Sequence, residues 1–374
     1  MIFKLLSFSI PRKAKILIYD ISGYEYYSEY LKKYSVEILF LRGESLNFYC
    51  ILFAIFKKIY NKDTLRNIYN DTFIDLVDPK LIITWVDNNK SFYSLSKRHK
   101  NVKTVFIQNG NRVEIGDIFE QIELKDKYKH HVDYMCVLNK QIGSYYKQFL
   151  SGNTIVTGSL INNKFQKISK CQNNNIIVFI SQFCPSVKGI ELLSKDSPLI
   201  TWNFFWQTDI RVIKYLANWC DINNKQLYIA ARTNDAKEYD FYNDVLKGYK
   251  CWRFYSRKTR TGSYDLIEKA NTIVSIDSTL GLEALARGFR VAFISRKPEF
   301  KLNSASFGWP YKFKNEGFFW TNLKKRESFN KILDNVTTCS DATWIEQAKP
   351  YIDNIMHHDY SNKRFNDLIS KLLK

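Results

Sequence analysis

Short runs rich in β-branched residues alternate with amphipathic stretches through most of the chain, and this alternation limits the fold more than any other feature. In the first half, strands are expected at residues 14–20, 36–41, 81–85, 104–107, 134–138 and 154–157. In the second half, they are expected at residues 176–180, 226–230, 272–275 and 291–294. Strands that alternate with helices at this spacing predict an α/β fold whose parallel sheets are covered on both faces.

The length of 374 residues corresponds to two domains of roughly 100–200 residues each. A polar stretch, Asn162–Asn175, is the best candidate for the linker between them. We therefore expect Rossmann-like domains over 1–165 and 172–340, followed by helices over 341–374 that pack back on the N-terminal domain. Ligands of such sheets bind beyond the carboxyl ends of the strands or in a cleft between two domains.

The composition describes a folded and strongly basic chain. Hydrophobic residues at 45% exclude disorder, and 56 Lys and Arg against 37 Asp and Glu give a net charge of +19. Such a charge is typical of a nucleic-acid binder, of a Lys-rich solvated surface, or of a face that attracts anionic membranes or phosphate-bearing substrates. No zinc-finger spacing, RNA-binding motif or dense arginine block occurs, so we expect no nucleic-acid partner.

The seven cysteines form no CxxC pair and stand at no zinc-like spacing from the five histidines, which favours reduced thiols in a cytoplasmic protein without a bound metal. No signal peptide or membrane span is expected. Pro11 interrupts the apolar N-terminus, and the most apolar later run, Phe48–Phe56, is about half a membrane span long. The aromatic and basic stretch Tyr49–Tyr60 is either a core-facing helix or a helix that docks peripherally on the inner membrane.

The segment 275–288 carries the most chemical information. A predicted strand ends at Ser275, the first residue of this segment. Ser278 or Thr279 is a suitable N-cap for the helix that follows. Gly281 in the first turn leaves room for a ligand, and free amides with the helix dipole favour a phosphate there. Glu283, one turn further, can reach a ribose hydroxyl. An ordinary capped crossover helix has the same features, so that alternative stays open.

This segment resembles the Ser-Thr-x-Gly-x-Glu-Ala-Leu signature of GT-B glycosyltransferases that build surface polysaccharides. The most similar groups are the Kdo transferases of capsule and lipopolysaccharide and the bacterial surface-carbohydrate biosynthesis proteins. Further matching stretches are residues 84–89, 108–112, 263–270, 308–310 and 317–320. The resemblance covers 263–295 well and most of the chain weakly. It implies a GT-B fold, with two doubly wound Rossmann-like domains facing across a cleft.

The resemblance places a nucleotide-sugar donor on the C-terminal domain. No Asp-x-Asp pair occurs, which agrees with a metal-independent enzyme that uses a helix dipole and basic side chains instead. An arginine after a strand can clamp a phosphate or a sugar carboxylate, although it can equally be a solvated loop residue. The expected donor-binding residues are Ser181, Gln182, Arg232, Asp277, Ser278, Thr279, Gly281 and Glu283.

Glycosyl transfer also needs a base near the acceptor, and the acceptor side of a GT-B cleft is the N-terminal domain. Asp87, at the carboxyl end of a strand, is the first candidate for a catalytic base, although an Asp that caps a helix is as consistent with the pattern. Glu114 is the second candidate. The expected acceptor-side residues are Asn88, Gln108, Asn109 and Arg112.

We therefore expect a glycosyltransferase that moves a sugar from a nucleotide-sugar donor to a growing surface polysaccharide, lipopolysaccharide or capsule acceptor, either an oligosaccharide or a lipid-linked glycan. CMP-Kdo or another CMP-linked acidic sugar is the donor that the resemblance favours, and no separate cofactor is expected. Two alternatives remain: a nucleotide-sugar epimerase of the same fold, and a non-catalytic protein that binds anionic polymers. Paired histidines and carboxylates, which epimerases carry, cannot be placed in the sequence.

Overall fold

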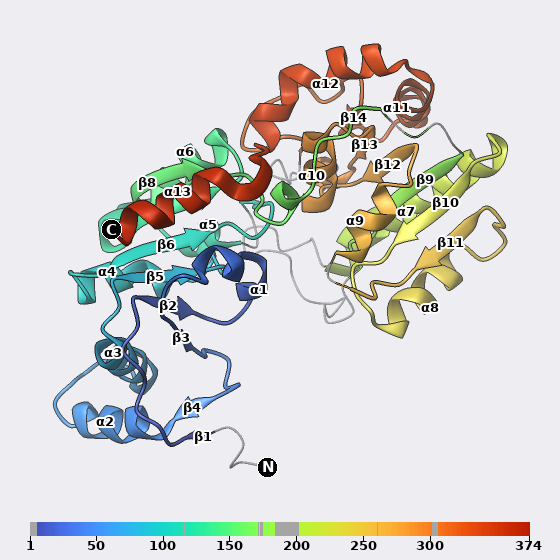
Figure 1. Cartoon of the computed structure of the whole chain (residues 1–374). Coiled ribbons are helices and arrows are strands. Elements are labelled where there is room, and N and C mark those ends of the chain that lie inside the picture. Colours follow the sequence, from blue (N-terminus) through green and yellow to red (C-terminus); the bar gives the residue numbers. More distant parts are fainter. Residues whose placement is uncertain are drawn as a thin grey trace. The chain divides into compact units, whose positions relative to one another are not determined.

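The computed structural model divides the chain into two compact units (Figure 1). Unit 1 comprises Met1–Gly110, Gln121–Lys164 and Asp359–Lys374, and unit 2 comprises Asn111–Glu120 and Phe165–His358. The structure describes residues 6–114, 117–170, 172, 175–183, 202–259, 261–300 and 306–374, without the side chains of 202–209 and 299–300.

Unit 1 is built on a six-stranded parallel sheet with the order β3-β2-β5-β6-β7-β8. The central strands β2 and β5 are buried along their whole length, as expected for strands covered on both faces. The strands are β2 Ile16–Tyr19, β3 Val36–Leu39, β5 Leu81–Thr84, β6 Lys103–Ile107, β7 His131–Val137 and β8 Ser151–Val156. A separate parallel pair joins β1 Leu6–Ser7 to β4 Leu46–Asn47.

Helices cover this sheet, and the last helix of the chain is one of them (Figure 1). The helices are α1 Tyr24–Tyr27, α2 Phe48–Lys58, α3 Leu65–Val77, α4 Leu95–Arg98, α6 Lys140–Phe149 and α13 Lys363–Leu372. Phe365 and Ile369 of α13 belong to the same hydrophobic cluster as Ile16 and Ile83 of the central strands. The C-terminal helix therefore completes the core of unit 1.

A buried asparagine fixes the point where the chain re-enters unit 1. The Asn362 side chain donates hydrogen bonds to the Leu160 carbonyl and the Tyr30 hydroxyl, both at 2.9 Å. Its Oδ1 accepts a hydrogen bond of 2.8 Å from Asn163. Because a buried amide is costly unless it is satisfied, these partners hold the start of α13 in one place.

Unit 2 contains a second six-stranded parallel sheet, with the order β11-β10-β9-β12-β13-β14. Its strands are β9 Ile176–Ile180, β10 Gln226–Ala230, β11 Trp252–Tyr255, β12 Thr272–Ser275, β13 Val291–Ile294 and β14 Trp320–Thr321. Its helices are α7 Trp202–Ile222, α8 Ala236–Val245, α9 Gly262–Ile267, α10 Thr279–Arg287, α11 Arg326–Thr338 and α12 Asp341–Ile355. The short helix α5, Ile118–Gln121, ends at the border between the units.

The C-terminal tail differs from the expected arrangement, because its helices are divided between the two units. Trp344 of α12 is buried in unit 2, where its indole N–H donates to the Gly288 carbonyl at 2.9 Å and its ring contacts Phe319 edge-on. Only α13 packs on unit 1. The burial of Trp344 fixes α12 on unit 2. Helix periodicity alone does not reveal which unit buries this side chain.

The predicted fold class is confirmed: each unit is a doubly wound α/β domain with a parallel sheet. The strands expected from β-branched runs are all present. The edge strands β11 and β14 escaped prediction because they are short and rich in aromatic residues rather than in Val and Ile. Within the described part of the chain, no helix combines the length and hydropathy needed to cross a membrane.

A charged cluster on unit 1 makes the stability of the fold dependent on pH. His99 Nε2 lies 3.0 Å from Asp71 Oδ1, and its Nδ1 lies 3.4 Å from Asp75 Oδ1. Burial by itself lowers the pKa of His99, but the hydrogen bonds and charges of the two aspartates outweigh it and raise the pKa to about 9. The protonated imidazole therefore stabilises the folded state.

We expect the free energy of unfolding to decrease between about pH 6.5 and pH 9, the ordinary and the folded pKa of His99. This contribution is complete below the first value and is lost as the pH rises through the second, with a size of up to about 3 kcal/mol. Urea titrations across this range measure it. His99→Gln should remove the slope, and an unchanged slope in that variant would contradict the assignment.

Candidate functional site

The carboxyl edge of the unit 2 sheet gathers polar side chains at the place where the strand order reverses. From β9 the chain adds β10 and β11 on one side, and it then crosses to add β12 and β13 on the other. Loops that leave neighbouring strands in opposite directions open a crevice, which is the usual ligand site of doubly wound sheets. The loops after β9 and β12 contain Gln182 and Asp277, two of the residues expected from the sequence.

These two residues meet a third that the sequence analysis missed. Lys297, in the loop after β13, is buried, and its Nζ lies 3.0 and 3.1 Å from the two carboxylate oxygens of Asp277. The Gln182 side-chain amide donates to the same carboxylate. The pairing offsets the cost of burying the ammonium group. The result is a buried ion pair beside the start of α10.

A buried glutamate shapes the loop that carries the expected arginine. Glu238 accepts backbone hydrogen bonds from Arg232 at 2.9 Å and Thr233 at 2.8 Å. The guanidinium of Arg232 then donates to the Gln182 carbonyl at 3.1 Å and remains largely exposed. Ser181 is buried, and its hydroxyl contacts Tyr242 at 2.9 Å and Phe183 N–H at 3.1 Å. Arg232 is thus presented at the edge, whereas Ser181 holds the turn.

The helix α10 begins at this edge. Ser278 is its N-cap in extended conformation, and its side chain makes no capping hydrogen bond. The Gly281 N–H donates to the Ser278 carbonyl at 3.0 Å, so the first-turn amides that can face a ligand are those of Thr279 and Leu280. The hydroxyl of Thr279 accepts a hydrogen bond of 2.8 Å from the Asn111 N–H. The positive end of a helix dipole with a lysine and an arginine nearby is suited to bind a phosphate.

Two other residues of α10 have contacts that differ from the expected ligand contacts. Glu283 is buried and accepts a hydrogen bond of 2.5 Å from the Tyr264 hydroxyl of α9. A Cβ added to Gly281 would lie 2.5 Å from Ser275 Oγ and 2.6 Å from Ser275 Cβ. The side of Gly281 where a Cβ would stand therefore faces Ser275 of strand β12. The missing side chain lets α10 approach the sheet closely.

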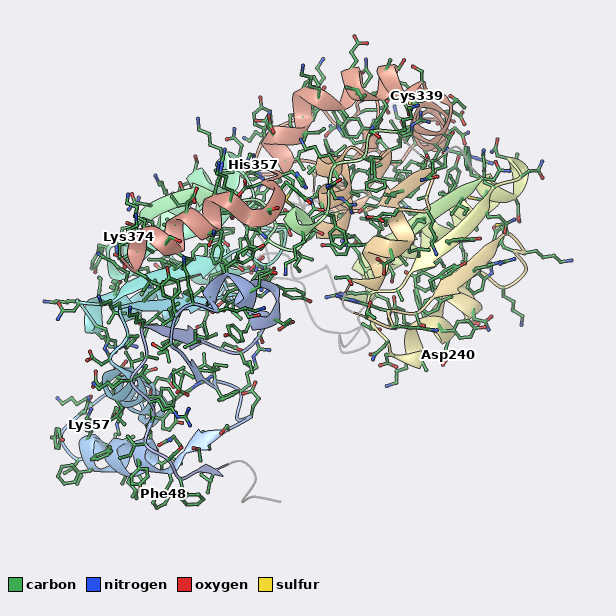
Figure 2. All side chains as sticks on the ribbon, in the orientation of Figure 1. Phe48, Lys57, Asp240, Cys339, His357 and Lys374 are labelled. Atoms are coloured by element: carbon green, nitrogen blue, oxygen red, sulfur yellow. The ribbon has the colours of Figure 1, made fainter. Side chains whose placement is uncertain are left out.

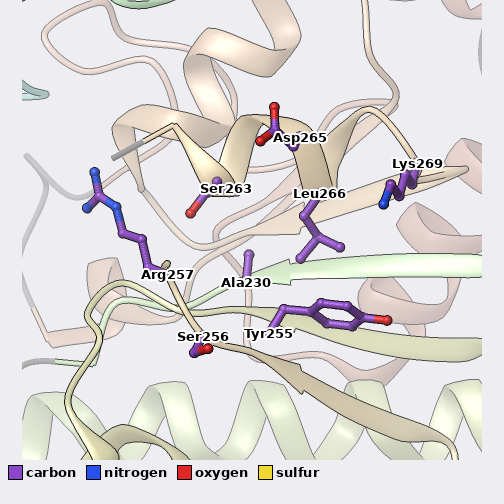
Figure 3. A pocket seen from close by; sticks show the side chains of 9 residues that line it. Ala230, Tyr255, Ser256, Arg257, Ser263, Asp265, Leu266 and Lys269 are labelled. Atoms are coloured by element: carbon purple, nitrogen blue, oxygen red, sulfur yellow. The ribbon is translucent and has the colours of Figure 1, made fainter. Parts of the chain in front are cut away.

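A small cavity of about 120 Å³ lies beside this edge, between the ends of β10 and β11 and helix α9 (Figure 3). Ala230 and Leu266 form its apolar part, with the Tyr255 ring along one wall. Arg257 and Lys269 are on opposite sides in Figure 3. The lining also includes Asp265, so that two basic residues and one acidic residue surround the aromatic ring, which offers a face for a flat ligand to stack on.

The segment Asn111–Glu120 belongs to unit 2, although it was expected in the N-terminal domain. Phe119 packs on Trp309 with 6.2 Å between ring centroids, and buried Arg112 lies 3.5 Å from Asp117. Arg112 is thus engaged by a carboxylate of its own segment. Glu114 is exposed, three residues after the Asn111 that contacts the start of α10.

Asp87 of unit 1 has a different environment from the one a general base requires. Its side chain is fully buried, with Oδ1 accepting from the Asn109 N–H at 3.1 Å and Oδ2 accepting from the Tyr146 hydroxyl at 2.5 Å. Tyr93 donates to its backbone carbonyl. In this conformation no acceptor hydroxyl reaches the carboxylate. Asp87 instead positions the loop after β6, where Asn109 is exposed.

The remaining acceptor-side residues also divide into buried and exposed. Gln108 is buried, accepts from the Leu138 N–H at 3.0 Å and donates to the Gly110 carbonyl at 2.9 Å. Asn88 is exposed at the end of β5. Gln108 therefore joins two loops of unit 1, whereas Asn88 and Asn109 present their amides to solvent.

The sequence analysis missed Lys297, Arg257 and Lys269. A signal for Lys297 was present, since it follows a predicted strand as Arg232 does, whereas Arg257 follows β11, which was not predicted. Among the residues that the structure describes, no three His, Cys, Asp or Glu side chains are grouped so that they could hold a metal ion. The groups available to an anionic ligand at this edge are basic side chains and helix amides.

Comparison with known proteins identifies the family of this chain. A family model described as O-antigen biosynthesis protein matches residues 105–373, which is well over half of the chain. The chain belongs to this family. The match includes the whole unit 2 sheet and the helix α10. No curated protein matches significantly.

Solved structures share the fold of this chain at low sequence identity. The wall teichoic acid polymerase TagF superposes with a TM-score of 0.54 at 9% identity, covering 96% of this chain and 89% of that one. A Listeria monocytogenes protein assigned as a UDP-N-acetylglucosamine 2-epimerase has a TM-score of 0.54 at 12% identity, covering 96% and 95%. A TagF variant soaked with CDPG has a TM-score of 0.50 at 11% identity, covering 96% and 88%. These similarities establish the GT-B type of fold.

The packing of α10 on β12 predicts that Gly281→Ala destabilises the protein, because the new methyl group overlaps Ser275. We expect a loss of about 1–3 kcal/mol in the free energy of unfolding, measured by urea titration. Ser275→Gly removes both clashing atoms, so the double variant should lose less than the two single variants together. Additive losses would show that the helix does not press on Ser275.

Proposed function

We propose that this O-antigen biosynthesis protein is a glycosyltransferase that moves a sugar from a nucleotide-sugar donor to a surface-glycan acceptor. The observation that carries the proposal is the carboxyl edge of unit 2, where the α10 N-terminus, Lys297 and Arg232 converge on the crevice between β9 and β12. These groups are suited to the diphosphate or monophosphate of a nucleotide. Family membership supports a role in surface polysaccharide assembly.

The donor phosphate binds at the first turn of α10, and Lys297 supplies positive charge from the neighbouring loop. Asp277 is close to this place and repels an anion, but its pairing with Lys297 and Gln182 reduces that repulsion. As the bond to the departing phosphate breaks, the helix dipole and the cations stabilise the developing charge without a metal ion. The nucleoside extends toward the cavity lined by Tyr255 and Arg257.

A CMP-linked acidic sugar, such as CMP-Kdo, is the donor we favour. It carries one phosphate and one sugar carboxylate, and the exposed guanidinium of Arg232 can bind a carboxylate with two parallel hydrogen bonds. The anchoring of the Arg232 loop by buried Glu238 supports this role, because a fixed loop loses less entropy when the ligand binds.

The catalytic base in this proposal is Glu114, which is exposed and near the start of α10. It removes the proton from the acceptor hydroxyl as that oxygen attacks the sugar. Asp87 contributes indirectly, by holding the loop that presents Asn109. Asn88 and Asn109 are proposed to bind hydroxyl groups of the acceptor glycan, and Arg112 keeps the segment of Glu114 in place through Asp117.

The proposed acceptor is a growing O-antigen or related glycan, either free or linked to a lipid, and the proposed place of action is the cytoplasmic face of the inner membrane. A nucleotide-sugar epimerase is the competing function, because the Listeria monocytogenes neighbour shares the fold. The two reactions differ in their products. A transferase releases the nucleotide only when an acceptor is present, whereas an epimerase changes the configuration of the sugar without any acceptor.

Donor binding is tested by thermal unfolding with CMP, CDP, UDP and GDP. We expect the preferred nucleotide to raise the melting temperature by several degrees at saturation, because it binds only the folded state. Arg232→Ala should weaken the binding of this nucleotide at least tenfold, and Arg211→Ala, which changes an exposed arginine in the middle of α7, should not. If oligonucleotides stabilise the protein and nucleotides do not, the protein binds anionic polymers and the proposal fails.

Catalysis is tested with Glu114→Gln and the matched control Glu120→Gln, which changes an exposed glutamate of the same segment. With the nucleotide sugar selected by binding, we expect Glu114→Gln to lower the rate of acceptor-dependent nucleotide release by about 10²–10⁴ while nucleotide binding persists. Chromatography of the released nucleotide measures the rate. Equal rates in the two variants would exclude Glu114 as the base.

A further inference from the structure

Helix α2 of unit 1 presents a broad apolar face to solvent. Its exposed residues, together with those of the turn that follows, are named here the α2 face: Leu52, Phe53, Ile55, Phe56, Ile59 and Tyr60. Phe56 is 63% exposed and Ile59 79% exposed. Single exposed apolar side chains are ordinary on a protein surface, but a contiguous group on one helix indicates a binding surface.

The α2 face takes no part in the packing of α2 on unit 1. The opposite side of α2 carries Cys50 and Ala54, which are buried, and the helix packs there against α3. Asn47 caps the helix by accepting a hydrogen bond of 3.1 Å from the Cys50 N–H. The helix is therefore held firmly from one side, and the α2 face is left for an external partner.

A further exposed aromatic residue lies beside the start of α2, and an apolar cavity lies on the other side of the helix, against α3. The Phe8 ring lies 5.3 Å from the Phe48 ring at the start of α2, and Phe8 is itself exposed. An apolar cavity of about 370 Å³ opens between α2, α3 and the end of β3, with Leu41, Leu46 and Leu65 among its lining residues. A flexible hydrocarbon chain can fill such a cavity without a complementary rigid surface.

The charge around the α2 face indicates the partner. Residues 45–62 contain no Asp or Glu, while Lys57, Lys58 and Lys62 follow the aromatic residues. Lys57 lies 3.4 Å from Asp75, and Lys58 donates to the backbone carbonyl of Asp63, whose carboxylate also interacts with it electrostatically. Figure 2 shows Phe48 and Lys57 toward opposite ends of α2. Apolar side chains bordered by three lysines, with no acidic residue among them, match an anionic lipid surface.

The length of α2 decides how it would meet a membrane. Its 11 residues span about 16 Å, roughly half of the ~30 Å hydrocarbon core, so the helix cannot cross it. A short helix with one apolar face lies in the plane of the interface, where its aromatic rings are at headgroup depth and its lysines reach the phosphates.

We propose that the α2 face binds anionic phospholipid membranes, with Phe53, Phe56 and Ile59 inserting and Lys58 and Lys62 contacting headgroups. This surface would bring the enzyme to a lipid-linked acceptor, and that role rests on the proposed function. Membrane binding itself follows from the exposure and charge of the α2 face.

The test is co-sedimentation of the full chain with vesicles of phosphatidylcholine alone and of phosphatidylcholine with roughly one third phosphatidylglycerol. We expect binding to the anionic vesicles that weakens with salt. Phe53→Ser with Phe56→Ser should reduce this binding at least tenfold. The matched control, Ile222→Ser with Ile345→Ser, changes two exposed isoleucines of unit 2 and should bind as the unchanged chain does.

Equal binding by the α2 double variant and the control, or no binding of the unchanged chain to either vesicle, would overturn the proposal. Light scattering resolves the main alternative, a second copy of this chain. A dimer that the α2 substitutions convert to a monomer, without vesicle binding, would make the α2 face a self-association surface. Thermal unfolding of the same variants with nucleotides separates a failure of this proposal from a failure of the proposed function. Donor binding depends on unit 2 and vesicle binding on unit 1, so each can fail without the other.

Discussion

The parallel direction of the strands is the constraint on which the rest of this structure depends. In a parallel sheet every strand ends at the same edge, so the residues that follow separate strands become neighbours. Gln182, Asp277 and Lys297 are far apart in the chain, yet they form one hydrogen-bonded group because β9, β12 and β13 are adjacent in the sheet. The candidate donor site is a consequence of this geometry.

Buried carboxylates hold both candidate edges in shape. In unit 2, Glu238 accepts two backbone N–H groups of the loop that carries Arg232. In unit 1, Asp87 has the same relation to the loop of Asn109. A buried carboxylate is tolerated only when its oxygens are satisfied, so each one fixes its loop in a single conformation. Exposed groups on those loops, Arg232 and Asn109, are thereby presented in fixed places.

The outcome for individual residues shows how far sequence reasoning extends. The strand-helix pattern around Ser278 located the start of α10, because capping residues and strand composition are local signals. The burial of Asp87 was beyond such signals, since its partner Tyr146 lies 59 positions away in the chain. The same holds for Gly281, whose missing side chain makes room for Ser275 of the preceding strand rather than for a ligand. Contacts of this kind exist only once the layers have packed.

The sequence by itself determined the α/β class and the presence of two doubly wound sheets, and it predicted a phosphate site at the start of α10. Each of these depends on short-range patterns: periodicity, β-branched runs and caps. Only the tertiary structure decided which carboxylates are accessible, that residues 111–120 belong with unit 2, that α12 and α13 belong to different units, and that α2 leaves an apolar face in solvent. The reason is physical, because burial and exposure depend on what packs against a residue, and helix periodicity is the same whether a partner covers the apolar face or none does.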